Sequence, residues 1–164
     1  MQFLGEEKRF HTAWFITGKV TEYAEPCAAL KTDGPRLIDH LSPHGFRCVH
    51  DTDVRSGTDA LTLGPLSVPI LTNTPHARPL MHAMFAHFMA IAPFTWALVD
   101  FNWLATIQAA PFIPNCSDVV VIGRVRWIPG SRDMSKDDYA WLRLDAKHTA
   151  GPVIHARIKT ERAR

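Results

Sequence analysis

The middle of the chain lacks charge altogether. Residues 79–99, PLMHAMFAHFMAIAPFTWALV, contain no Asp, Glu, Lys or Arg, although charged residues make up 21% of the 164 residues. The run predicts a helix over about residues 79–92 that is apolar on every side and must therefore be surrounded. Pro93 makes this helix too short to cross a bilayer, and His82 and His87 interrupt it with polar groups. We therefore expect a buried core helix and no association with a membrane.

Other absences exclude several classes of protein. The sequence has three cysteines, Cys27, Cys48 and Cys116, and they form no CxxC pair. This pattern is typical of reduced thiols in a cytoplasmic protein rather than of a disulfide framework. The N-terminal residues are acidic where a signal peptide would be basic, so no export is expected. No zinc-ligand spacing, GxSxG phrase or glycine-rich phosphate loop is present, and we predict neither a metal nor a cofactor.

Length and composition predict one domain over residues 1–164. A hydrophobic content of 46% suits a folded globular protein, and 164 residues are enough for one substantial core. The formal net charge of +2 is too small to indicate a nucleic-acid partner.

Alternating patterns predict strands on both sides of the central helix. Residues 12–22 and 46–54 favour strands, residues 36–41 favour a short helix, and the prolines of residues 60–71 favour an edge or irregular strand. After the helix, alternating segments at 96–106, 117–128, 139–147 and 153–160 predict an antiparallel meander with one solvent-exposed face.

The second half of the chain resembles a known family. The segment PLMHAMF, residues 79–85, is similar to the helix start PIAHGMF of hotdog-fold hydratases and dehydratases of the MaoC and FabZ kind, with Ala83 in place of the usual Gly. Residues 99–125 look like the strand, connecting phrase and strand that follow in that family. The resemblance implies an α+β, hotdog-like fold, in which an antiparallel sheet wraps around one central helix, and a homodimer. The family's D-x-N-P-x-H phrase and its helical Glu are both absent.

By this resemblance, the chain is a lyase of the hydratase or dehydratase type. Its partner would be an acyl thioester, linked to coenzyme A or a carrier protein, or a polyketide-like carbonyl compound. The first turn of the helix would polarise the substrate carbonyl. The candidate catalytic residues are His76 and His82 for proton transfer and Asp100 as a base. The candidate substrate-binding residues are Ala83, His87, Asn102 and Trp103. The alternatives are an acyl thioesterase and a non-catalytic protein of the same fold that binds an acyl group or completes a partner's site.

Overall fold

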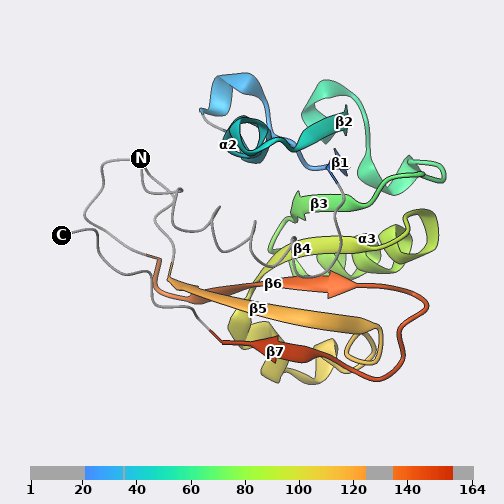
Figure 1. Ribbon diagram of the computed structural model, residues 1–164, viewed down its shortest axis with the longest axis vertical. Coiled ribbons are helices and arrows are strands. Elements are labelled where there is room, and N and C mark those ends of the chain that lie inside the picture. Colours follow the sequence, from blue (N-terminus) through green and yellow to red (C-terminus); the bar gives the residue numbers. More distant parts are fainter. Residues whose placement is uncertain (1–20, 35, 125–134, 157–164) are drawn as a thin grey trace.

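One seven-stranded sheet organises the computed structural model, which describes residues 21–34, 36–124 and 135–156 (Figure 1). Its strands, in chain order, are β1 (Glu22–Glu25), β2 (Arg47–Asp51), β3 (Ile70–Asn73), β4 (Thr95–Asp100), β5 (Cys116–Arg124), β6 (Asp138–Leu144) and β7 (Val153–His155). The helices are α2 (Leu37–Leu41) and α3 (Arg78–Ile91). Short 3-10 turns fill much of the remainder: η1 (Lys31–Asp33), η2 (Ser42–His44), η3 (Val54–Ser56), η4 (Ala60–Thr62), η5 (Phe101–Ala105) and η6 (Ile107–Ala109).

The sheet is mixed, with a parallel half and a largely antiparallel half. Its strand order is β2-β1-β3-β4-β6-β5-β7. The neighbours β2, β1, β3 and β4 all run parallel. Strand β6 runs antiparallel to both β4 and β5, and β7 pairs parallel with β5 at the edge. Because parallel neighbours need a crossover, α3 links β3 to β4 across one face of the sheet.

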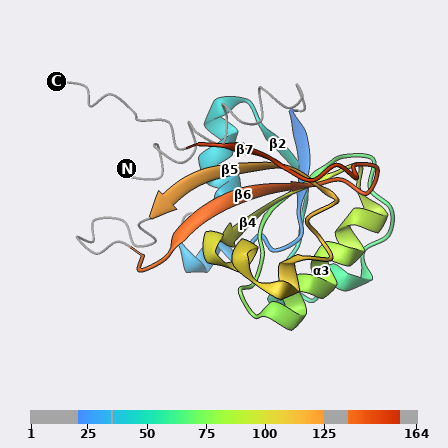
Figure 2. The ribbon, with the colours of Figure 1, turned by 90° about the horizontal axis from the view of Figure 1, so that it is seen from below.

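Alternate residues of the strands feed hydrophobic clusters on the two faces. Leu71 and Trp96 pack in one cluster with Leu41 of α2. Ile70 of β3 joins the cluster of α3 on the other face, together with Phe88. Figure 2 shows the same layering, with α3 on one side of the strands and α2 on the other. The core therefore consists of two layers separated by the sheet, rather than one layer around a helix.

The central helix is buried along one stripe only. Its buried residues Met81, Met84, Phe85 and Phe88 follow the i, i+3, i+4, i+7 spacing of an amphipathic helix. Beyond the first turn, the exposed residues of the helix are Ala83, Ala86 and Ala90, and Leu80 in the first turn is exposed as well. The prediction that α3 is buried on every side is wrong, because alanine has a small apolar surface and a high helix propensity and is tolerated against solvent.

The predicted hotdog-like fold is also wrong. Helix α3 is not wrapped by a sheet but crosses between the parallel strands β3 and β4. The strands after it do not form a simple meander, because β6 lies between β4 and β5. Residues 70–73 form an inner strand rather than an edge strand, since β3 pairs on both sides.

Several local predictions are confirmed. The expected helix near residues 79–92 is α3, and the short helix expected at 36–41 is α2. Strands occur within the segments predicted at 46–54, 117–128, 139–147 and 153–160. The strand predicted at 96–106 is only half right, because β4 ends at Asp100 and Phe101–Ala105 form η5. Almost all of the segment predicted at 12–22, together with residues 125–128 and 157–160, lies outside the described residues.

No helix in the described ranges is both long and apolar enough to span a bilayer. The cytoplasmic location stays a prediction.

The stripe on α3 gives a direct test of this fold. Replacing the fully buried Phe85 by Ala should lower the free energy of unfolding by about 3–5 kcal/mol, because it leaves a cavity. Replacing its neighbour Ala86, which faces solvent, by Lys should change that free energy by about 0.5 kcal/mol or less. Urea denaturation of both variants checks the pair, and a large loss for Ala86→Lys would show that α3 is enclosed on all sides.

Candidate functional site

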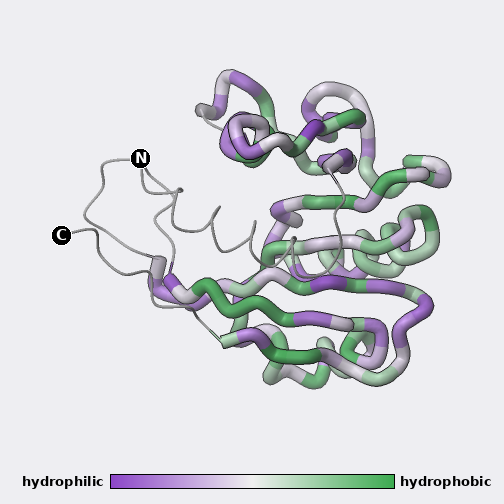
Figure 3. Tube along the Cα trace, in the orientation of Figure 1, coloured by the Kyte–Doolittle hydropathy of each residue, from purple (hydrophilic) through white to green (hydrophobic). Residues whose placement is uncertain are grey.

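Each of the four parallel strands ends on a polar residue. These are Glu25, Asp51, Asn73 and Asp100, and we call them, with the residues that directly follow each, the carboxyl edge. Figure 3 shows β3 changing from hydrophobic to hydrophilic at this end. Since parallel strands place their carboxyl ends at one edge of a sheet, four segments distant in sequence meet there.

The chain changes direction in the sheet between β1 and β3. From β1 it moves outward to β2, and it then returns to the other side of β1 to form β3. In open α/β sheets, ligands bind outside the carboxyl ends of the strands at such a switch point. The loop after β1 and the loop after β3 are therefore the first places to look for a ligand.

Glu25 is a buried carboxyl at this switch point. Its side chain is 1% exposed, and Oε1 accepts a hydrogen bond from the Cys27 N–H at 3.3 Å. Burial raises the pKa of Glu25 to about 8, and nearby donors, the Thr72 hydroxyl first among them, offset part of that rise. Within the described part of the chain, no hydrogen bond of normal geometry reaches Oε2. Glu25 thus offers a buried acceptor, protonated near neutral pH, to a group that brings a proton donor or a positive charge.

The loop after β1, residues 26–30, contains a left-handed alanine. Ala29 has a φ of 58°, a conformation that costs an L-residue about 1–2 kcal/mol and normally favours glycine. Ala28 is buried and Ala29 is half-buried, and their small side chains let the loop pack closely against its neighbours. Hydrogen bonds from Ala28 N–H to the Thr52 carbonyl and from Thr52 N–H to the Glu25 carbonyl, of 2.9 and 3.1 Å, hold this loop against the one after β2.

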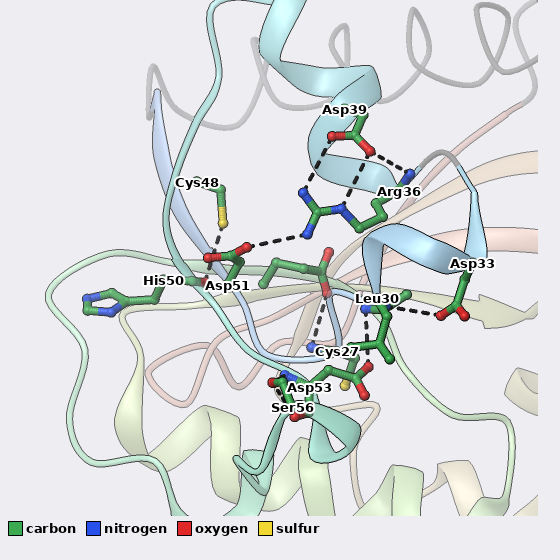
Figure 4. Close-up of polar contacts among 12 residues, drawn as sticks. Cys27, Leu30, Asp33, Arg36, Asp39, Cys48, His50, Asp51, Asp53 and Ser56 are labelled. Atoms are coloured by element: carbon green, nitrogen blue, oxygen red, sulfur yellow. Dashed lines mark hydrogen bonds and ion pairs between the residues drawn. The ribbon is translucent and has the colours of Figure 1, made fainter.

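The end of β2 carries an acidic residue next to an arginine. Asp51 Oδ2 lies 3.4 Å from Arg36 Nη1, and the same guanidinium lies 3.5 Å from Asp39 (Figure 4). Hydrogen bonds from Arg36, from its backbone N–H first, hold the pKa of Asp39 below its usual range. Asp51 is 56% exposed, so its carboxylate remains available to a ligand. An acidic residue at this position is suited to accept hydrogen bonds from ribose hydroxyls.

The end of β3 leads to an exposed amide and an exposed imidazole. Asn73 and His76 are both exposed, and the His76 ring meets the edge of Tyr139 with 5.7 Å between ring centroids. Tyr139 pairs in register with Asp100 of β4. Between Asn73 and His76, Thr74 is 1% exposed, and its hydroxyl has no hydrogen-bond partner among the described residues. The ends of β3, β4 and β6 thus gather an amide, an imidazole, a phenol ring and a carboxylate.

The predicted site residues fall into two groups. His76 and Asp100 lie at the carboxyl edge, and Asn102 follows with its N–H bound to Asp100 Oδ1 at 2.9 Å. The others lie along α3 or pack against it. His82 Nε2 accepts a hydrogen bond from Trp103 Nε1 at 2.9 Å.

The rest of the second group is engaged in packing or exposed. His87 Nε2 lies 3.0 Å from the Leu63 carbonyl oxygen, Trp103 is buried, and Ala83 faces solvent. The roles given to these residues stay predictions.

Sequence reasoning missed Glu25, Asp51 and Asn73. Glu25 and Asn73 each follow a short apolar or β-branched run directly, as Asp100 does, whereas His50 stands before Asp51. Repeated endings of this kind are the signal that could have indicated a parallel sheet with a polar edge. In the described ranges, no group of three or more His, Cys, Asp or Glu side chains is placed to hold a metal ion.

Comparison with known proteins adds evidence on the fold. No protein-family model matches the chain, and no curated protein matches it. The crystal structure of a protein from Pyrococcus horikoshii, assigned as an RNA methyltransferase, is similar with a TM-score of 0.53 and 10% identity, over 84% of this chain and 81% of that one. The crystal structure of the 23S rRNA methyltransferase ErmE gives a TM-score of 0.45 and 15% identity, over 92% of this chain and 69% of that one.

The chain has an α/β fold with a mixed seven-stranded sheet, similar to the fold of the Pyrococcus horikoshii protein. The resemblance to hotdog hydratases is therefore wrong, and so are the lyase function and the hotdog, dehydratase and acyl-CoA assignments that rested on it. The predicted partners, an acyl thioester with no nucleic acid, are contradicted as well, and the implied homodimer loses its basis. The fold is compatible with an enzyme but supports neither a lyase nor a thioesterase.

Glu25 makes stability depend on pH in a defined direction. Because its pKa is raised from 4.5 to about 8 on folding, the folded state holds a proton that the unfolded state loses between those values. The free energy of unfolding should therefore fall by up to about 1.4 kcal/mol per pH unit between pH 5 and 8, relative to the Glu25→Gln variant. Chemical denaturation across that range measures the difference, and parallel curves for the two proteins would contradict a protonated, buried Glu25.

Proposed function

We propose that this chain is an S-adenosylmethionine-dependent methyltransferase that acts on a nucleobase of a nucleic acid, with RNA as the first substrate to test. The observation that carries the proposal is the carboxyl edge, where polar groups from β1, β2, β3 and β4 converge at the switch point of a methyltransferase-like sheet. The protein of similar fold from Pyrococcus horikoshii is assigned as an RNA methyltransferase, which supports the choice of reaction class.

The residues present fit S-adenosylmethionine. Glu25 Oε2 is a buried acceptor with no hydrogen-bond partner of normal geometry among the described residues, which suits an ammonium group. Ala28 and Ala29 add little side-chain bulk to the loop after Glu25, and the exposed Asp51 suits the ribose hydroxyls. When bound, the cofactor supplies an electrophilic methyl group.

Asn73 is the residue that we assign to the acceptor base. An amide can accept a hydrogen bond from an exocyclic amine and donate one to a ring nitrogen, as in the pairing of Asn with adenine. Asn73 is exposed at the end of β3, the strand next to β1, so its amide lies on the same edge as the proposed cofactor residues. It would orient the attacking group.

His76 and Asp100 complete the proposed site. Enzymes that modify a nucleobase hold it between flat side chains outside the base stack. The exposed His76 ring, steadied against Tyr139, offers such a surface. Asp100, whose Oδ1 binds the Asn102 N–H, keeps a second oxygen that can take the proton that the methylated group releases.

Arginines at the same edge suit a nucleic-acid backbone. Arg124 is exposed at the end of β5, and Arg78 begins α3, with Nη1 3.1 Å from Gln108 Oε1. Phosphate contacts from such residues contribute sequence-independent affinity that falls with salt. The net charge of +2 thus does not exclude this class of partner, because phosphate contacts depend on the charges at the contact surface and not on the sum over the chain.

Transfer of a labelled methyl group tests the proposal. The full chain is incubated with methyl-labelled S-adenosylmethionine and, separately, with total RNA, single-stranded DNA and duplex DNA. We expect incorporation into RNA. Asn73→Ala should lower turnover about 100-fold or more and leave cofactor affinity within about threefold. Asp51→Ala should instead weaken cofactor binding about tenfold.

The control is Lys147→Ala, since Lys147 is exposed beyond β6 at the opposite end of the parallel strands and should leave both quantities unchanged. Incorporation into DNA alone would keep the reaction and replace the proposed substrate. Absence of cofactor binding to the folded wild-type protein would overturn the proposal.

A further inference from the structure

Two carboxylates bind the backbone of the loop after β1, residues 26–30, and one guanidinium joins the two carboxylates. Asp53 Oδ2 accepts the Ala29 N–H at 3.2 Å, and Asp33 Oδ2 accepts the Leu30 N–H at 3.0 Å. Arg55 lies between the two acids, with Nη2 2.5 Å from Asp33 Oδ2 and Nε 3.2 Å from Asp53 Oδ1. Two consecutive backbone N–H groups are thus held by two carboxylates that share one guanidinium. We call Asp33, Asp53 and Arg55 the clasp.

The clasp joins segments that are separate in the chain. Asp33 ends η1, whereas Asp53 and Arg55 belong to the turn after β2 (Figure 4 shows Asp33 and Asp53). Asp53 is the best buried of the three, at 14% side-chain exposure, and it also accepts the Arg55 N–H at 2.9 Å. Hydrogen bonds from Arg55 and from the Leu30 N–H hold the pKa of Asp33 below its usual range. The clasp therefore spans the loops that follow β1 and β2.

The loop needs such support because it lacks glycine. Ala29 takes a left-handed conformation that a glycine would adopt without strain, and the sequence offers no glycine between β1 and Gly34. A side-chain carboxylate that accepts the Ala29 N–H favours this conformation over the relaxed alternatives. The arginine fork reaches the two carboxylates from two separate nitrogens, Nε and Nη2, whereas a lysine has one nitrogen and no fixed fork.

We propose that Asp33, Asp53 and Arg55 are positioning residues that keep residues 26–30 in the conformation that receives the methionyl part of the cofactor. The inference rests on the proposed function, because it names the cofactor of that site. The clasp touches no reacting group and acts through Ala29 and Leu30. The clasp thus stabilises a backbone conformation that glycines adopt without strain in other nucleotide-binding loops.

A double-mutant cycle with Ala29→Gly tests the clasp. The probe is S-adenosylhomocysteine, titrated by calorimetry at about 0.05 M salt. Arg55→Ala should raise the dissociation constant about fivefold, and Arg55→Lys should not restore it. In the Ala29→Gly background the same Arg55→Ala change should cost less than about twofold, because glycine needs no support there. At about 1 M salt, the difference between wild type and Arg55→Ala should nearly vanish.

Arg47→Ala is the matched control, because Arg47 also pairs with a carboxylate, Glu22, but at the start of β2. It should leave the dissociation constant unchanged. An unchanged constant for Arg55→Ala, full rescue by Arg55→Lys, or the same cost in both backgrounds would overturn the inference.

Hydrogen exchange separates this inference from the proposed function. Without ligand, the Ala29 and Leu30 amides should exchange about tenfold faster in Arg55→Ala than in wild type. If wild type binds no S-adenosyl compound, the proposed function fails and the cofactor role of the clasp fails with it, whereas the exchange rates still decide whether the clasp holds the loop. Equal exchange in the two proteins would overturn the clasp even if the cofactor binds.

Discussion

Parallel pairing of β1 with β3 and of β3 with β4 is the constraint on which the rest of this structure depends. Parallel neighbours cannot be joined by a tight turn, so α3 must cross one face of the sheet and bury a stripe against it. The same pairing brings Glu25, Asp51, Asn73 and Asp100 to one edge although they are far apart in sequence. The strand pairing and the packing of α3 against the sheet thus also bring these polar side chains together.

The site combines a buried carboxyl group with exposed polar side chains. Glu25 is withdrawn from water, which raises its pKa, whereas Asp51 and Asn73 are open to a ligand. A buried carboxyl without a full set of partners is costly to folding, and such costs cluster at functional positions. The strained Ala29 lies in the loop that follows Glu25, so two local departures from the most stable arrangement occur side by side.

The sequence predicted elements better than it predicted their arrangement. Helix α3 and several strands were predictable because their apolar spacing is local, and Pro93 marks the end of the helix clearly. Pairing partners were not, since nothing in the alternation of residues 139–144 says that β6 inserts between β4 and β5. The uncharged run 79–99 favoured an enclosed helix, because alanine occurs at both exposed and buried positions and the sequence alone does not distinguish them.

The candidate site was predictable in part for the same reason. His76 and Asp100 stood out as polar groups beside an apolar segment, and both lie at the carboxyl edge. Glu25 and Asp51 did not stand out, since their place at the site depends on the pairing of β1 with β2 and β3. This pairing is a long-range property. Asp53 and Arg55 gain their role only through contacts with residues about 20 positions earlier.

The central claim is that the carboxyl edge at the β1–β3 switch point is a binding site for an S-adenosyl compound. The most direct measurement is an NMR titration of the isotope-labelled chain with S-adenosylhomocysteine, following backbone amide shifts. The account predicts saturable shifts concentrated in residues 26–30, around Asp51 and at Asn73, with little change in β5 and β7. Shifts spread elsewhere, or none at millimolar ligand, would contradict it.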